Sequence, residues 1–148
     1  MPANTSPIFA RKPNIGQGGA ILGPTAITAQ DGTGSLPKIF DADATNGSFV
    51  RKVVLKPAGS PAGTVCRIFL CSDTGTYTPG TTNTAANTTM IAEVALAAVT
   101  SSNSAAQNDV VIPIMEAIPA GFKLLISFGT STGAAGTGYG VTVFAGDY

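Results

Sequence analysis

From residue 25 onward the chain consists of short runs of β-branched and aromatic residues, separated by Gly, Thr, Asn and Pro. In several runs the apolar residues recur at every second position, which is the period of a half-buried strand. Dipeptides such as Asp31-Gly32 and Asn46-Gly47 lie between the runs, and such residues supply the positive φ with which a chain reverses direction. The sequence therefore predicts a chain made almost wholly of β-strands and turns.

Eight runs of this kind predict an all-β fold, a jelly-roll-like sandwich of two sheets with about eight strands. In the run 122–130, Phe122, Leu124, Ile126 and Phe128 are expected to face the core, with Lys123 on the opposite face. The loop 72–89 is rich in Thr, Asn and Gly and is expected at the surface. The runs are 25–30, 36–41, 49–56, 64–71, 90–96, 110–115, 122–130 and 139–145.

Residues 1–24 are rich in proline and glycine and show neither helical nor strand periodicity. Proline removes hydrogen-bond donors, so this segment is expected to be an extended N-terminal arm, outside a sandwich domain of residues 25–148. The arm carries both apolar and cationic side chains, which we expect to contact another protein; a terminus without a partner is the alternative. These candidate contact residues are Phe9, Arg11, Lys12, Ile15, Ile21 and Leu22.

The composition argues against catalysis and against nucleic-acid binding. The chain has no His and only 11% charged residues, against roughly 25% in an average domain. Serine and cysteine nucleophiles therefore lack the imidazole that usually activates them. The net charge is zero, so no long-range field gathers polyanions. We expect a non-enzymatic protein without a cofactor.

One segment begins like a calcium-binding loop. Asp41, Asp43 and Thr45 place oxygen-bearing side chains at alternate positions, as a hard cation requires. The pattern then departs from the calcium loop, because Asn46 stands where glycine is needed and Lys52 where a bidentate glutamate is needed. A solvated turn capped by an aspartate is the favoured interpretation, and no metal site is predicted.

The two cysteines, Cys66 and Cys71, lie five residues apart in one predicted strand. That spacing places them on opposite faces and roughly 16 Å apart, beyond the ~7 Å between Cα atoms that a disulfide tolerates. Buried, inert thiols are predicted, with an intersubunit disulfide or a metal ligand as the alternatives.

No run of about 18 apolar residues is present, and the N-terminus lacks the pattern of a secretory signal. We therefore expect that the protein is made in a cytoplasm and does not associate with a membrane.

Three segments carry a resemblance to a known family: residues 118–130 (IPAGFKLLISFGT), residues 140–148 (GVTVFAGDY), and Asn46-Gly47-Ser48 leading into residues 53–57 (VVLKP). Together they resemble small structural proteins of tailed bacteriophages, and within that set they are most similar to head decoration, or cement, proteins. The resemblance covers about residues 25–148. It implies a β-sandwich that forms a homotrimer on the outside of the capsid and ties neighbouring capsomers together.

The resulting expectation is a virion structural protein on the outer capsid surface, made in the host cytoplasm. Its expected partners are the major capsid protein and further copies of itself, with the arm clamping adjacent capsomers. The alternative is a tail fibre or baseplate module that binds a host-surface glycan through the loop 72–89, which contains Tyr77.

Overall fold

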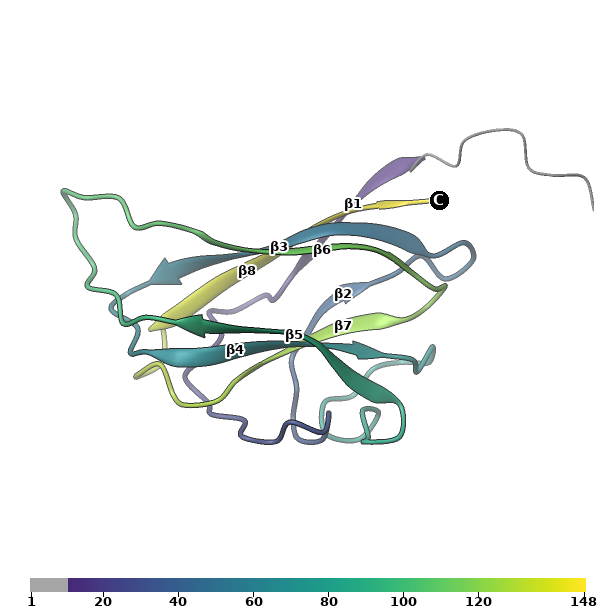
Figure 1. Cartoon of the computed structure of the whole chain (residues 1–148), viewed down its shortest axis with the longest axis horizontal. Helices are drawn as coiled ribbons and strands as arrows, with labels where there is room; N and C mark the ends of the chain where they lie inside the picture. The colour runs from purple at the N-terminus through teal and green to yellow at the C-terminus, as the bar shows by residue number, and fades with distance from the viewer. Residues whose placement is uncertain (1–10) are drawn as a thin grey trace, which may run out of the picture.

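A computed structural model describes residues 11–148 of the chain (Figure 1). Within that range it is an all-β protein of eight strands without an α-helix, which confirms the predicted fold class. The strands are β1 (Lys12–Gln17), β2 (Lys38–Asp41), β3 (Ser48–Ala58), β4 (Thr64–Cys71), β5 (Thr88–Leu96), β6 (Val110–Ile118), β7 (Lys123–Phe128) and β8 (Gly138–Asp147).

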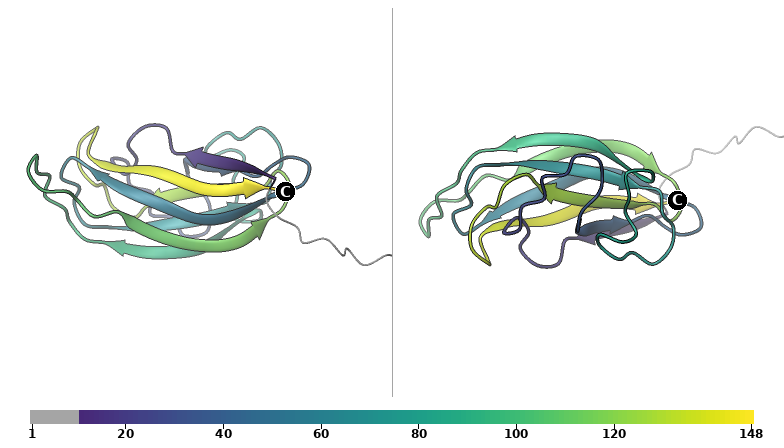
Figure 2. Two further views of the ribbon diagram at one scale, coloured as in Figure 1. Left: turned by 90° about the horizontal axis from the view of Figure 1, so that it is seen from above. Right: turned by 90° about the horizontal axis from the view of Figure 1, so that it is seen from below.

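The strands form two antiparallel sheets of four that pack face to face as a sandwich (Figures 1 and 2). Sheet A has the order β1-β8-β3-β6, and sheet B has the order β2-β7-β4-β5. The pairs are nested along the chain, because β1 pairs with β8, β2 with β7, β3 with β6 and β4 with β5. A chain folded back on itself in this way and then wound into two sheets is a jelly roll.

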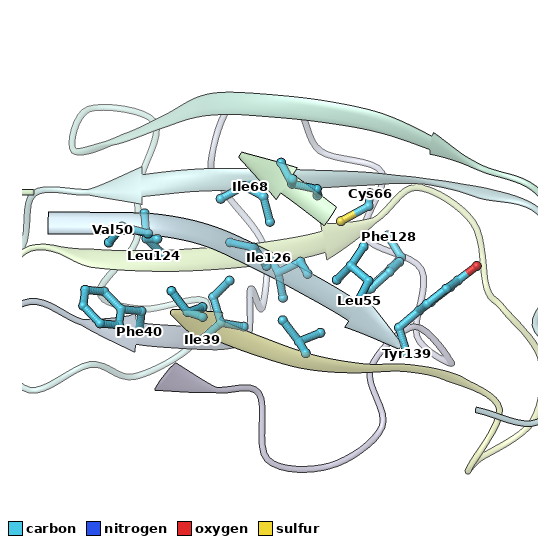
Figure 3. Packing of buried hydrophobic residues seen from close by; sticks show 14 of the residues in the cluster. Ile39, Phe40, Val50, Leu55, Cys66, Ile68, Leu124, Ile126, Phe128 and Tyr139 are labelled. Carbon is cyan, nitrogen blue, oxygen red and sulfur yellow. The ribbon is translucent and has the colours of Figure 1, made fainter. Parts of the chain in front are cut away.

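The main core lies between the sheets and is made of the inward-facing residues of both (Figure 3). Val53 and Leu55 of β3 are fully buried there, opposite Ile68 of β4 and Ile126 of β7. At the end of this core the rings of Phe128 and Tyr139 stack with their centroids 5.7 Å apart. The inward-facing residues, which recur at every second position, thus pack as one layer of aliphatic and aromatic side chains between the sheets.

The structure corrects the expected position of the first strand. Residues 25–30 form no strand, although the Ile27 amide donates a hydrogen bond to the carbonyl oxygen of Phe128. Instead, β1 comes from the segment that we expected to be an arm, and it is an edge strand of sheet A. An edge strand pairs on one side only and so tolerates Pro13, which is why proline content was a poor guide here.

Lys123 lies on the predicted face of β7, opposite Leu124 and Ile126, but that face is not exposed to solvent as alternation predicts. Lys123 is only 3% exposed, because β7 is buried on both faces. A second apolar cluster covers the outer face of sheet B and contains Leu36, Phe69, Cys71 and Leu125. The buried Lys123 ammonium has hydrogen-bond partners within the protein: it donates to the carbonyl oxygens of Asp73 (2.6 Å) and Gly121 (3.0 Å).

The loop between β4 and β5 lies at the surface, as its polar composition predicted, but it is fastened to the sandwich at a few buried positions. Asn83 is buried, and its amide nitrogen donates hydrogen bonds to the carbonyl oxygens of Gly32 and Gly34, both at 2.8 Å. The Tyr77 side chain packs against the second cluster. This loop and the segment that leads into β2 together cover sheet B, and in Figure 1 they lie below the lower sheet.

The cysteine prediction is confirmed. Cys66 and Cys71 are both free and buried, Cys66 in the main core and Cys71 in the second cluster on the opposite face of sheet B. Burial raises the pKa of the Cys66 thiol to about 12, so the reactive thiolate is disfavoured.

The turn at residues 43–47 is the aspartate-capped turn that the sequence favoured. The Asp43 carboxylate accepts hydrogen bonds from the backbone amides of Asn46 (2.8 Å) and Thr45 (3.0 Å), which lowers its pKa. Gly47 supplies the positive φ of 79° that completes the reversal.

The two long sides of the sandwich differ. On the side of β1 and β2 the sheets approach so closely that a Cβ atom on Gly16 would lie 2.1 Å from the carbonyl oxygen of Ile39. On the side of β5 and β6 a groove with a volume of about 430 Å³ remains between the sheets, lined by Leu70, Ile91 and Ile114 among others. One side is therefore closed by backbone contact and the other is open.

Candidate docking surface

The outer face of sheet A is the broad face of the sandwich that no loop of the described chain covers (Figure 1). On the opposite side of the molecule, the outer face of sheet B lies under its two loops. A flat sheet face left open to solvent is the natural place for a partner to bind, and its side chains show which kind of partner fits.

Cross-strand registers place the outward residues of sheet A in rows. Pro13, Gly146 and Phe49 form one row across β1, β8 and β3. Gly146 has no side chain, so nothing fills the space in this row between the rings of Pro13 and Phe49. The result is a shallow hollow of about 440 Å³, with Pro13 and Phe49 among its lining residues.

The next row carries two further exposed apolar side chains. Ile15 of β1 is 55% exposed and pairs with Phe144 of β8, which is 38% exposed. Lys52 of β3 pairs with Phe144 on its other side, and its ammonium lies 5.2 Å from the centroid of the Phe144 ring. Such a cation–π contact is worth about 0.5–1 kcal/mol at an exposed site and holds the ring in place.

A bulge in β3 adds a further cation to the hollow. The register with β8 passes from Val50–Ala145 directly to Lys52–Phe144, so Arg51 is the extra residue without a partner of its own. A bulge redirects the side chain that it carries, and Arg51 is exposed and lines the hollow. The hollow therefore has aromatic and aliphatic walls with cations at its rim.

The buried Asp147 carboxylate beside this face is engaged within the chain. Asp147 Oδ1 accepts hydrogen bonds from the Ser48 hydroxyl (2.5 Å) and from the Asn14 side-chain amide (2.8 Å), while Oδ2 lies 3.5 Å from the Lys12 ammonium. These contacts fasten β1 to β3 and β8. Within residues 11–148, Arg11, Arg51 and Lys52 have no carboxylate within ion-pair distance, so the hollow is positively charged.

The structure gathers some of the predicted contact residues and separates others. Arg11 and Ile15 lie on the outer face of sheet A, at the hollow or beside it, whereas Lys12 lines the hollow but has its ammonium beside Asp147 and Asp43. Leu22 instead forms a β-bridge with Tyr139 and packs against the main core, so it is a structural residue. Ile21, next to it in the chain, is half-buried and remote from the hollow's lining residues. Phe9 lies outside the described residues.

We expected Lys12 to present a free charge to a partner, but it does not. Its ammonium approaches Asp147 and Asp43 of its own chain, the latter at 4.0 Å. The reason is that β1 belongs to the sandwich, which places Lys12 next to the last residues of β8.

Four residues of this surface were not predicted from the sequence: Phe49, Arg51, Lys52 and Phe144. The signal for Phe144 was present, because Val141 and Val143 are inward residues and alternation places Phe144 outward. Nothing in the pattern indicated the bulge at Arg51, since bulges depend on how two neighbouring strands align.

The loop that we had considered for glycan binding does not offer a free tyrosine. The Tyr77 hydroxyl lies 2.6 Å from the Leu36 carbonyl oxygen and 2.9 Å from Asn83 Oδ1. Its burial, together with the nearby Cys71, raises the pKa of Tyr77 well above its ordinary value. Tyr77 therefore fastens the loop to the sandwich.

Residues 11–148 contain no cluster of three or more His, Cys, Asp or Glu side chains that could hold a metal ion. In the same residues no helix is long and apolar enough to cross a membrane. Comparisons of the chain with protein-family models, with curated proteins and with solved structures found no match.

Proposed function

We propose that the chain is a structural protein of a tailed-bacteriophage virion that decorates the outer surface of the head and binds the capsid lattice through the outer face of sheet A. The observation that carries this proposal is the one-sidedness of the sandwich. One sheet face lies under two loops, whereas the other presents an apolar hollow with unpaired cations among the described residues. The resemblance of residues 46–57, 118–130 and 140–148 to head decoration proteins supports the same function.

The hollow defines the kind of surface that it fits. Phe49 and Phe144 offer apolar area, and Arg51 and Lys52 offer two cations beside it. A matching capsid surface presents an apolar side chain flanked by carboxylates. Burial of the apolar pair contributes affinity, and the charges fix the orientation and speed the encounter.

Self-association into a homotrimer belongs to the same proposal. The open side of the sandwich carries Ile91 on β5, 41% exposed, and Met115 on β6, 57% exposed. Both lie on the edge strands that border the groove between the sheets. Contact between copies at this side would cover these side chains, while sheet A remains available to the capsid.

Immunogold labelling of phage particles tests the location. Antibodies against the protein are expected to mark heads, whereas marks confined to the tail tip would favour a tail module, and unlabelled particles would refute both. Binding to isolated heads tests the surface. Phe144→Asp and Arg51→Glu are expected to abolish or weaken cosedimentation with heads. Ala105→Glu, a charge change in the exposed loop between β5 and β6, is the matched control and should bind as the native chain does.

A further inference from the structure

One edge of the sandwich differs from the others in the regularity of its backbone. Within residues 11–148 there are four edge strands, β1 and β6 in sheet A and β2 and β5 in sheet B. The ladders that join β2, β5 and β6 to their neighbours each contain a register shift, and such irregularities keep a further strand from adding to an edge. The ladder between β1 and β8 runs from Lys12 to Gln17 without a shift. The edge of β1 therefore lacks this protection.

The hydrogen bonds of β1 show which of its backbone groups face away from the sheet. The Gly18 amide donates to the Val141 carbonyl oxygen at 3.1 Å, in continuation of the register between β1 and β8. In an antiparallel ladder every second residue turns its amide and carbonyl groups toward the neighbouring strand, so Ile15 and Gln17 turn theirs away from β8. Among the described residues no hydrogen-bond partner meets these groups.

This free edge is open to solvent. Pro13, Ile15 and Gln17 are exposed, and Figure 2 shows β1 at the margin of sheet A, beside β8. The close contact with β2 is made by the inward-facing Gly16, whose Cβ would meet the Ile39 carbonyl oxygen. Pro13 lies where its missing amide hydrogen would face away from β8, which is the position that proline takes in an edge strand.

The side chains beside the edge select the chemistry of a strand that adds to it. Ile15 is an apolar side chain on the outer face, 55% exposed. Arg11 immediately precedes β1, lines the hollow with Pro13, and has no carboxylate within ion-pair distance in residues 11–148. Every second side chain of an added strand would point to the same outer face. The edge therefore fits an apolar residue beside Ile15 and, four positions along, a carboxylate beside Arg11.

A second copy of the chain fits this edge less well than an acidic segment does. Pairing of two β1 strands would bring two sets of the unpaired cations Arg11, Arg51 and Lys52 to one sheet face, and like charges across an interface repel. An acidic segment instead supplies the carboxylates that these cations lack within the described chain.

We propose that the free edge of β1 binds an extended acidic peptide segment of a partner protein, which adds to sheet A as a further strand. The Ile15 and Gln17 amides donate to carbonyl oxygens of the segment, and the carbonyl oxygens of both residues accept from its amides. The Pro13 carbonyl oxygen accepts one more hydrogen bond. In binding of this kind the main-chain bonds give affinity, and the alternate side chains give specificity.

The inference goes beyond the proposed function and does not depend on it. The capsid contact was argued from the outer face of sheet A, whereas the added strand lies at the margin of that sheet and bonds to the β1 backbone. Any partner with an exposed acidic strand could supply the segment, so the binding can be measured with a synthetic peptide.

Amide hydrogen exchange followed by NMR tests the inference on the full chain. In the free protein the Ile15 and Gln17 amides should exchange fast, and those of Asn14 and Gly16, which face β8, should exchange slowly. The probe is the peptide acetyl-Thr-Thr-Ile-Thr-Val-Thr-Glu-amide. Antiparallel to β1, it places its isoleucine beside Ile15 and its glutamate beside Arg11. At a peptide concentration of about ten times Kd, exchange of the Ile15 and Gln17 amides should slow about tenfold.

A matched pair of variants tests the backbone contact. Ile15→Pro removes an amide hydrogen that faces away from β8, so the ladder between β1 and β8 stays intact while peptide affinity should fall about tenfold or more. Ile15→Val keeps that amide and a branched apolar side chain, and it should bind the peptide within about twofold of the native chain.

A reversal of charge tests the selectivity. Arg11→Glu should weaken binding of the glutamate peptide and strengthen binding of the same peptide with lysine in place of glutamate. A purely structural effect of the substitution would weaken both.

The inference is overturned by any of four results: the peptide causes no chemical-shift change up to about 1 mM, Ile15→Pro binds like Ile15→Val, Arg11→Glu leaves the preference between the two peptides unchanged, or the Ile15 and Gln17 amides are already protected without peptide. Protection that grows with the concentration of the protein alone would assign the edge to a second copy. Phage heads that carry no label would refute the proposed function and leave these measurements unaffected.

Discussion

The substitution Lys123→Ala should have different effects on stability according to the alternation of the sequence and according to the structure. By alternation alone, Lys123 is a surface residue whose loss changes stability by no more than about 0.5 kcal/mol. In the structure its ammonium is enclosed and donates to two carbonyl oxygens, those of Asp73 and Gly121. The substitution removes both hydrogen bonds and leaves two carbonyl oxygens without their donor.

The expected size of the loss follows from these contacts. A hydrogen bond from a charged donor contributes about 1.5–3 kcal/mol, so two contribute about 3–6 kcal/mol. Part of this is offset, because burying an ammonium costs several kcal/mol and that cost disappears with the charge. We expect Lys123→Ala to lower the free energy of unfolding by about 2 kcal/mol. Lys123→Met keeps the apolar stem and should cost less.

Urea unfolding followed by circular dichroism measures this loss. With a slope of about 2 kcal/mol per molar urea, a 2 kcal/mol loss moves the midpoint by roughly 1 M. Arg51→Ala is the control, since Arg51 is exposed and forms no ion pair with residues 11–148. If the midpoints of Lys123→Ala and Arg51→Ala coincide, Lys123 is not enclosed and hydrogen-bonded as described.

Four further predictions concern the fold. Gly16→Ala should destabilise the protein by more than about 1 kcal/mol because the new Cβ meets the Ile39 carbonyl oxygen, whereas Gly140→Ala, with its nearest neighbour at 3.8 Å, should be milder by urea unfolding. Deletion of Pro2–Gly23 removes β1 and should lower the melting temperature by several degrees; an unchanged value would show that β1 contributes nothing. Because burial raises the pKa of Tyr77, its contribution to stability is intact below the unfolded pKa of about 10 and is lost as pH rises above it, so urea midpoints should fall between pH 9 and 11. Dithiothreitol should leave the melting temperature unchanged, since both thiols are free.

Seven of the eight strands could be predicted, because each is a short run rich in apolar residues between turn residues and several of these runs alternate. The run 64–71 coincides with β4, and the runs 49–56 and 139–145 lie inside β3 and β8. The core covers at least one face of each of these strands, so apolar residues recur on that face and can be recognised in the sequence. β1 has no such signal, because it is an edge strand whose outward Ile15 is more exposed than its inward neighbours.

The candidate site was predictable only in part. Arg11, Lys12 and Ile15 were chosen for their chemistry. Arg11 and Ile15 do lie on one surface, whereas the Lys12 ammonium lies beside carboxylates of its own chain. Phe49, Arg51 and Phe144 join them from strands 34 to 133 residues away in the chain, and this proximity comes from the pairing of β1, β3 and β8.

The sequence by itself determined the fold class, the turns and the state of the cysteines, because each depends on residues close together in the chain. Strand period, the positive φ of Gly47 and the separation of Cys66 from Cys71 are local properties. The tertiary structure alone decided which sheet face is covered, whether Lys123 is buried, and where β1 pairs. These depend on the loops that pack over sheet B and on the nested pairing of distant strands, and an alternating pattern cannot show whether its second face meets water or another layer of the same chain.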